Sequence, residues 1–381
     1  MHRMYKQKCM EENRKPVSDE KYRSVFKEYN LGFYKPKKDQ CKKCLSYSTM
    51  TEEEKALNKE CHDKHINKKN DARKCRDEDK SLAKADTFIL AFNSDLEAVL
   101  YTPKGSAGQI FYLRKLSVYN FTVYDLVTQD VDCYLWDETQ GKRGSNEIST
   151  IIFDYVMAHP NINAVRMMSD GCGGQQKNSI VMAMCLQLLL KHPKLQVIDH
   201  KFFEPGHTEM ECDSIHSKIK VKSKNVPVYV PEGWAQLIRD SRRNPAPYEV
   251  HTMTFDDFYD YKTLSENIIA KNKLPIQTIC WLHYDKKYPD KIFYKTSFDQ
   301  EEFTEVAVKK TRGRPKSLTL LKAYKATLPI SVPKFADLQT MCKDNTITKG
   351  YHEFYNSLKT NKDVRDALAE PDFEEPDEEP E

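Results

Sequence analysis

The block MMSDGCGGQQKN, residues 167–178, has the residue types of a ligand-binding loop. Asp170 follows an apolar run that is typical of a buried strand. In open α/β sheets, ligands bind beyond the carboxyl ends of the strands, and glycines let the backbone approach them closely. Lys177, at the start of the next predicted helix, could contact a phosphate. In the alternative interpretation Asp170 only caps that helix.

Other acidic residues could join Asp170 in the folded chain. Asp95 follows the first predicted strand, and Asp213 lies on a later predicted helix with Glu211 as a neighbour. Asp199, which ends the predicted strand LQVID, is a fourth candidate. Converging carboxylates repel one another unless cations neutralise them, and two Mg²⁺ or Mn²⁺ ions about 4 Å apart can clamp a phosphodiester. The pattern therefore predicts a two-ion site formed by Asp95, Asp170 and Asp213, with Glu211 or Glu209 as the alternative third acid.

Two histidines lie in the same segment, GHTEMECDSIHS. His207 could hydrogen-bond a phosphate or transfer a proton, or it could bind zinc together with His216 and either Cys212 or Asp213. A structural role for His207, fixing the loop, stays open.

The N-terminal region contains a second set of potential metal ligands. Cys41 and Cys44 have the C-x2-C spacing of half a zinc knuckle, and Cys61 with His65 could supply the other half. We expect a zinc-folded, DNA-docking module. The alternative is a Lys-rich helix pair with incidental cysteines.

The segment KKTRGRPKS carries Arg312 and Arg314 around a glycine. Such an RGRP core resembles an AT-hook, whose arginines enter the narrow minor groove of A·T-rich DNA. A solvated linker is the other interpretation.

The elements that must position these residues follow from periodicity. Three strands are predicted from DTFILAF, GQIFYLRKLSVYNFTVYDL and VDCYLWDE, and then helices alternate with strands up to a helix that opens near Thr208. The order βββ-α-β-α-β-α predicts an α/β fold with a mixed, helix-covered sheet, as in ribonuclease H-like folds.

This pattern divides the chain into five regions. The divisions are a basic helical region 1–84, a catalytic-type core 85–224, a small α+β appendage 225–310, a basic RGRP segment with a helical C-terminal region 311–368, and an acidic disordered tail 369–381.

Charge and composition narrow the class of protein. Residues 1–84 carry 23 Lys and Arg against 15 Asp and Glu, which suits nucleic acid, although a merely solubilising surface stays open. No stretch approaches the roughly 18 apolar residues of a membrane span, and the start lacks a secretory signal. The eleven cysteines fit buried thiols and a metal site better than a disulfide framework. We expect a nuclear protein with DNA as partner that could form a homo-oligomer.

Seven blocks, among them FYLRKLSVYNFTVYDL, SDGCGGQQKN and GHTEMECDSIHS, carry a resemblance over residues 22–248. The chain resembles a large group of animal proteins, many from mobile elements, that share a domain of unknown function. The resemblance implies a transposase-like protein with a ribonuclease H-like core whose acids match Asp95, Asp170, Glu211 and Asp213. The chain departs from the pattern at Ser94, where phenylalanine is usual, and at Gly171, where asparagine is common. These departures leave open a decayed or domesticated copy of an element, and the short N-terminus before Tyr22 suggests a truncated one.

Three function classes follow. The first is Mg²⁺-dependent DNA cleavage or strand transfer, the second is DNA binding without catalysis, and the third is a zinc-dependent hydrolase that uses His207 and His216.

Overall fold

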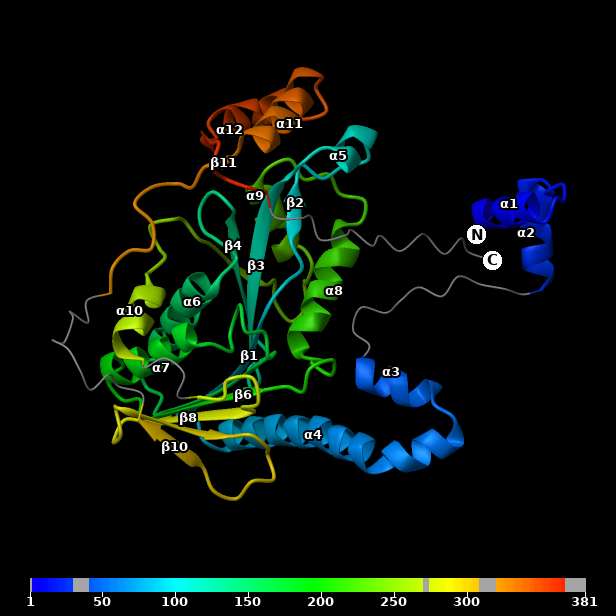
Figure 1. The fold of residues 1–381 in the computed structure, drawn as a ribbon. Coiled ribbons are helices and arrows are strands. Elements are labelled where there is room, and N and C mark those ends of the chain that lie inside the picture. Colours follow the sequence, from blue (N-terminus) through cyan, green and yellow to red (C-terminus); the bar gives the residue numbers. More distant parts are fainter. Residues whose placement is uncertain (1, 30–40, 270–273, 308–319, 367–381) are drawn as a thin grey trace.

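A computed structural model describes residues 2–29, 41–269, 274–307 and 320–366 of the chain. Within these ranges ten strands form one mixed sheet, and two further strands form a small ribbon (Figure 1). The strands of the large sheet are β1 (Ile89–Leu96), β2 (Leu100–Thr102), β3 (Leu116–Asp125), β4 (Val131–Asp137), β5 (Ala164–Ser169), β6 (Val197–Phe202), β7 (Glu249–Thr252), β8 (Trp281–Asp285), β9 (Lys291–Lys295) and β10 (Thr304–Ala307). The ribbon pairs β11 (Ile330–Ser331) with β12 (Thr360–Asn361).

The helices alternate with the central strands of the sheet, as the periodicity predicts. They are α1 (His2–Glu11), α2 (Asp19–Glu28), α3 (Lys42–Thr49), α4 (Glu52–Ala85), α5 (Gly108–Tyr112), α6 (Ser145–Met157), α7 (Ser179–Lys191), α8 (Glu211–Ser223), α9 (Pro231–Arg239), α10 (Tyr261–Ile268), α11 (Val332–Lys343), a 3₁₀ turn η1 (Lys349–Tyr351) and α12 (His352–Asn356). The mixed α/β class is confirmed.

The strand order in the sheet is β10-β9-β8-β6-β5-β1-β3-β4-β7, with β2 paired to β3. Strands β1, β3 and β4 form the expected antiparallel meander, while β5 lies parallel to β1 and β6 lies parallel to β5. Parallel neighbours need crossover connections, and α6 and α7 are well placed to serve as them. The carboxyl ends of β1 and β5 therefore lie side by side.

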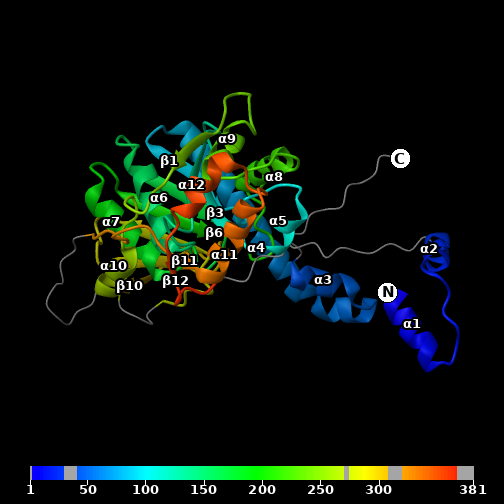
Figure 2. The same cartoon turned by 90° about the horizontal axis from the view of Figure 1, so that it is seen from above.

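Helices cover both faces of the sheet (Figures 1 and 2). On one face, Ile148, Ile151, Ile152 and Tyr155 recur at helical spacing along α6 and pack with α7, α10 and every second residue of the strands. On the other face α8 and α9 bury a second cluster, and α4 lies along β1. Because side chains alternate along a strand, Phe92 of β1 packs in the first cluster and Asp95 faces α8.

Helix α4 is anchored to the sheet by a buried ion pair. Thr51 and Glu54 form a reciprocal capping box at its start. Further along, Asp79 accepts a hydrogen bond from Lys201 of β6 at 2.7 Å, and both side chains are buried. The basic N-terminal region is therefore docked on the core through α4.

Three sequence predictions about the elements were wrong. The segment GQIFY is the helix α5 and not strand, because it buries Ile110 while the consecutive aromatics Phe111 and Tyr112 are exposed. Helix α8 begins at Glu211 and not near Thr208, so Glu209 precedes it. The segment expected as a separate appendage adds β7 to one edge of the sheet and β8, β9 and β10 to the other.

Candidate metal sites

Two groups of side chains in the described residues could hold a metal ion. One contains Asp95, Asp213 and His216, and the other contains Cys41, Cys44, His65 and His207. In each group the potential ligand atoms lie within 4.8 Å of one another. We call them the acidic group, to which Asp170 is added below, and the Cys/His group.

The acidic group lies where β1, β5 and α8 meet. Asp95 is the next-to-last residue of β1, Asp170 directly follows β5, and Asp213 lies in the first turn of α8. The Nδ1 atom of His216, one turn further along α8, is 3.8 Å from Oδ2 of Asp95. The Nε2 atom of the same ring lies 3.0 Å from the hydroxyl of Thr122, which is the cross-strand neighbour of Asp95.

Burial and mutual repulsion perturb these carboxyls. Burial, followed by repulsion from Asp170 and then from Asp213, raises the pKa of Asp95 to about 8. Burial also raises the pKa of Asp170, with Asp213 contributing repulsion. The Oδ1 atom of Asp170 is buried and has no hydrogen-bond partner among the described residues. The three acids are therefore close enough to sense one another, and one oxygen of Asp170 lacks the partner that a buried oxygen normally has.

Hydrogen bonds of Asn178 and Gln176 hold the loop after Asp170 in place. Asn178 caps α7 by accepting hydrogen bonds from the amides of Ile180 and Val181, so the cap of this helix is Asn178 and the alternative role for Asp170 is wrong. Gln176 is buried and exchanges hydrogen bonds of 2.9 Å with Ser94, the residue before Asp95. The loop that carries Asp170 is thereby tied to the strand that carries Asp95.

Two candidate residues near the acidic group have other contacts. The carboxylate of Glu211 accepts a hydrogen bond from Asn93, and one of its oxygens lies 3.8 Å from Arg76. Lys177 is buried and donates to the carbonyl of Gln277 at 3.0 Å, so it does not present its amine to DNA in this structure. Arg312 and Arg314 lie outside the described residues.

Sequence reasoning missed a cation beside the acids. Burial raises the pKa of both Asp95 and Cys172, and the positive charge of Arg143 opposes that rise. Its guanidinium donates to the carbonyl of Glu97 at 3.3 Å. Arg143 lies between β4 and α6, and nothing in the spacing of the KRG sequence indicates that it reaches the end of β1.

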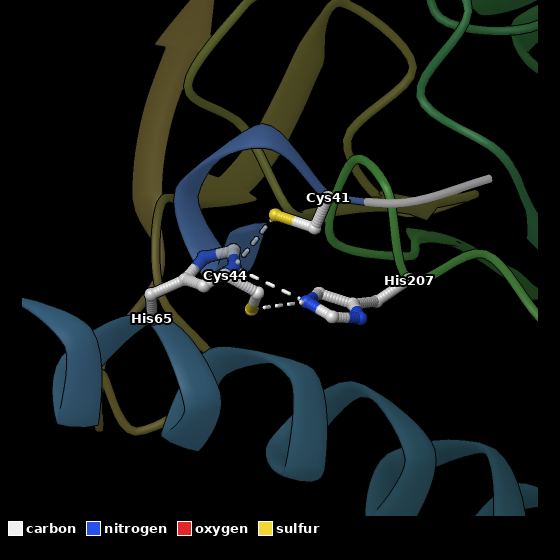
Figure 3. Close-up of side chains that lie close together, drawn as sticks. All are labelled: Cys41, Cys44, His65 and His207. Atoms are coloured by element: carbon white, nitrogen blue, oxygen red, sulfur yellow. Dashed lines mark hydrogen bonds between the residues drawn. The ribbon is translucent and has the colours of Figure 1, made fainter. Parts of the chain in front are cut away.

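The Cys/His group joins three distant segments (Figure 3). Cys41 and Cys44 lie at the start of α3, His65 lies on α4, and His207 lies in the loop between β6 and α8. Sγ of Cys41 is 3.1 Å from Nε2 of His65, and Sγ of Cys44 is 3.3 Å from Nε2 of His207. The two Nε2 atoms are 3.2 Å apart.

The predicted zinc set was wrong in one member. Cys61 is exposed and is absent from the group, and His207 occupies the fourth place. The neighbouring His62 stacks on Tyr47 with ring centroids 3.9 Å apart. Because His207 and His216 belong to different groups, a single zinc ion coordinated by both is not supported.

Comparison with known proteins gives a match to a family model. A family model described as a domain of unknown function (DUF7869) matches residues 126–300. The matched part contains Asp170, His207 and Asp213, whereas Asp95 and the other members of the Cys/His group precede it. Neither the curated proteins nor the solved structures give a match. Among the described residues, no helix combines the length and the apolar character that crossing a membrane requires.

Proposed function

We propose that the protein cleaves or joins DNA phosphodiesters with divalent metal ions, as a transposase-like enzyme with a ribonuclease H-like core. The observation that carries the proposal is the meeting of Asp95, Asp170 and Asp213, which come from two adjacent parallel strands and a helix. Burial raises the pKa of Asp95 and of Asp170, and repulsion from the neighbouring carboxylates adds to the rise. A cation bound among these carboxylates would relieve that repulsion.

The topology supports the same proposal. The central strand order is β4-β3-β1-β5-β6, with the first three antiparallel and the last two parallel to β1, and this order supports a ribonuclease H-like core as part of the proposal. Helix α8 then returns across the face toward which Asp95 points. The resemblance implies acids at three positions, which here are Asp95 on β1, Asp170 directly after β5 and Asp213 on α8.

The residues present fit Mg²⁺ or Mn²⁺ chemically. Both ions prefer carboxylate oxygens and water, and the donor set offers three carboxylates with one orphaned oxygen on Asp170. Asp95, Asp170 and Asp213 would hold the ions, which when bound supply an activated water and stabilise charge on the phosphate. Burial lowers the pKa of His216 to about 4, and its ring contacts the hydroxyl of Thr122 while Nδ1 lies 3.8 Å from Asp95.

The surroundings suit a phosphate backbone. At Gly171, Gly173 and Gly174 an added Cβ would lie no closer than 3.8 Å to a neighbouring atom, so internal packing does not require glycine there. Small residues beside Asp170 instead leave room for a ligand. The charge of Arg143 reaches Asp95, and a guanidinium at this place attracts a phosphate.

The test is metal-dependent nicking of supercoiled DNA, including DNA that contains the ends of the parent element. We expect Asp170→Asn to lower the Mn²⁺-dependent rate at least about 100-fold, because loss of a direct ligand should cost more than loss of its supporting contacts. Glu211→Gln is the matched control, since its carboxylate contacts Asn93 and Arg76, and it should keep most activity. Full activity in Asp170→Asn would refute the proposal.

A second candidate is DNA binding without catalysis in the nucleus. The excess of Lys and Arg in residues 1–84 favours it. It predicts salt-dependent DNA binding that Asp170→Asn leaves unchanged, with no cleavage by the unaltered protein in Mg²⁺ or Mn²⁺.

A further inference from the structure

We propose that Cys41, Cys44, His65 and His207 bind one zinc ion that fastens α3 and α4 to the loop between β6 and α8. Zinc bonds of about 2.3 Å to sulfur and 2.0–2.1 Å to nitrogen place neighbouring tetrahedral ligands about 3.3–3.8 Å apart. The three contacts in the group, 3.1, 3.2 and 3.3 Å, are close to those separations. The proposal is independent of DNA cleavage.

The histidines present the correct atoms. Nδ1 of His65 lies 3.2 Å from a carboxylate oxygen of Glu204, so an N–H on Nδ1 donates to Glu204 and Nε2 keeps its lone pair toward Cys41. A carboxylate behind a histidine is the usual support of a zinc ligand. Nε2 of His207 lies 3.3 Å from Sγ of Cys44 and 3.2 Å from Nε2 of His65, so it faces the centre of the group.

The cysteines are placed for metal binding by α3. Cys41 is the N-cap residue and Cys44 lies in the first turn, where the amide groups of the helix favour thiolates. Cys41 makes no capping hydrogen bond with its side chain, which leaves Sγ directed to the group.

Close backbone approach shows that the two segments are fitted to each other. Gly206 has a φ of +79°, and a Cβ there would lie 2.9 Å from the Cα of Cys41. Only glycine accommodates both that conformation and that contact. The chain therefore brings the loop of His207 directly against the start of α3.

Four protein ligands and partial burial define a structural zinc site. Catalytic zinc sites keep one position open for water, whereas this group supplies two sulfurs and two nitrogens. His207 lies between Glu204, which supports His65, and Glu209, which pairs with Arg73 of α4. The ion would hold the loop that leads into α8, whose first turn carries Asp213.

The experiment measures zinc in the purified full-length chain by mass spectrometry, with His207→Ala compared against Cys61→Ser. We expect one zinc per chain in the unaltered protein and in Cys61→Ser, and loss of the metal from His207→Ala during dialysis against a weak chelator. Zinc retained by His207→Ala but lost from Cys61→Ser would replace the proposed set by the local Cys61 set. Absence of zinc from the unaltered protein would overturn the proposal.

Cobalt substitution keeps the test decisive if His207→Ala does not fold. Co²⁺ in the unaltered chain should give the visible bands of a tetrahedral site and a sulfur-to-metal charge-transfer band. His207→Cys retains four ligands, and its third thiolate should raise that band by about half. An unchanged band in this folded variant would show that residue 207 is not a ligand.

Discussion

Breaking the buried pair between Asp79 and Lys201 should release α4 from the sheet. The side chains of Asp79 and Lys201 are 7% and 2% exposed, and Nζ lies 2.7 Å from Oδ2. Lys201 also lies 4.0 Å over the ring of Trp281. Removing one partner leaves a buried charge without compensation, so Asp79→Asn should lower the free energy of unfolding by about 3–5 kcal/mol.

The magnitude is measured by urea unfolding, followed by circular dichroism and tryptophan fluorescence. The double variant Asp79→Leu with Lys201→Met should recover most of the loss, because two apolar residues replace both charges at once. Glu60→Gln is the control on the same helix. Its partner Lys64 lies 2.7 Å away at the surface, where water and salt screen the pair, so its loss should change the free energy of unfolding little.

Two results would refute the reasoning on α4. One is a loss below about 1 kcal/mol in Asp79→Asn, which would show that this charge is not desolvated as the geometry indicates. The other is a double variant as unstable as Asp79→Asn, which would assign the loss to packing.

The remaining predictions concern His200 and Gly206. Burial lowers the pKa of His200 to about 3, so the folded chain excludes a proton that the unfolded chain binds below pH 6.5. Stability from the neutral ring is therefore present above pH 6.5 and is lost as pH falls, by about 2 kcal/mol at pH 5 relative to His200→Gln. Parallel pH profiles of urea unfolding for the two proteins would contradict this. Gly206→Ala should destabilise the chain by about 1–3 kcal/mol and speed zinc loss to a chelator, because Cβ would meet Cys41 at a positive φ. If Gly206→Ala retained zinc as well as the unaltered protein, the proposed close packing of the Gly206 loop against the start of α3 would be contradicted.

The local sequence pattern was sufficient to predict that Asp170 follows a strand. The apolar run before it, the polar turn after it and the helical spacing of α7 are all short-range signals, and the structure has β5, the loop and α7 in that order. Because side chains alternate along β1, Asp95 is expected on the face of the sheet opposite to that of Phe92. What the pattern could not show is that Asn178 and not Asp170 caps α7, since both are good capping residues and only one can reach the free amides.

The fourth member of the Cys/His group lay beyond local reasoning. Cys61 and His65 have a plausible ligand spacing one helical turn apart, but His207 is 142 positions from His65 in the chain. Spacing rules describe ligands on one short segment and give no information on which loop a long helix will meet. The signal that could have helped is the glycine before His207, whose positive φ marks a close approach.

Charge pattern was misleading for Lys177 and Glu211. Both look like exposed functional groups at helix starts, yet Lys177 is buried with a carbonyl partner and Glu211 lies between Asn93 and Arg76. Their partners Gln277, Asn93 and Arg76 lie far away in the sequence, so helical periodicity cannot identify them. Tertiary contacts decided both roles.

The most direct test of the acidic site is a calorimetric titration of Mn²⁺ into the unaltered protein and into Asp95→Asn, Asp170→Asn and Asp213→Asn. Mn²⁺ prefers oxygen ligands, so zinc bound by cysteine and histidine should not interfere. We expect saturable binding that each variant weakens at least about 10-fold, with Glu211→Gln unchanged. Equal affinity in the unaltered protein and in all three variants would contradict a shared metal site at the meeting of β1, β5 and α8.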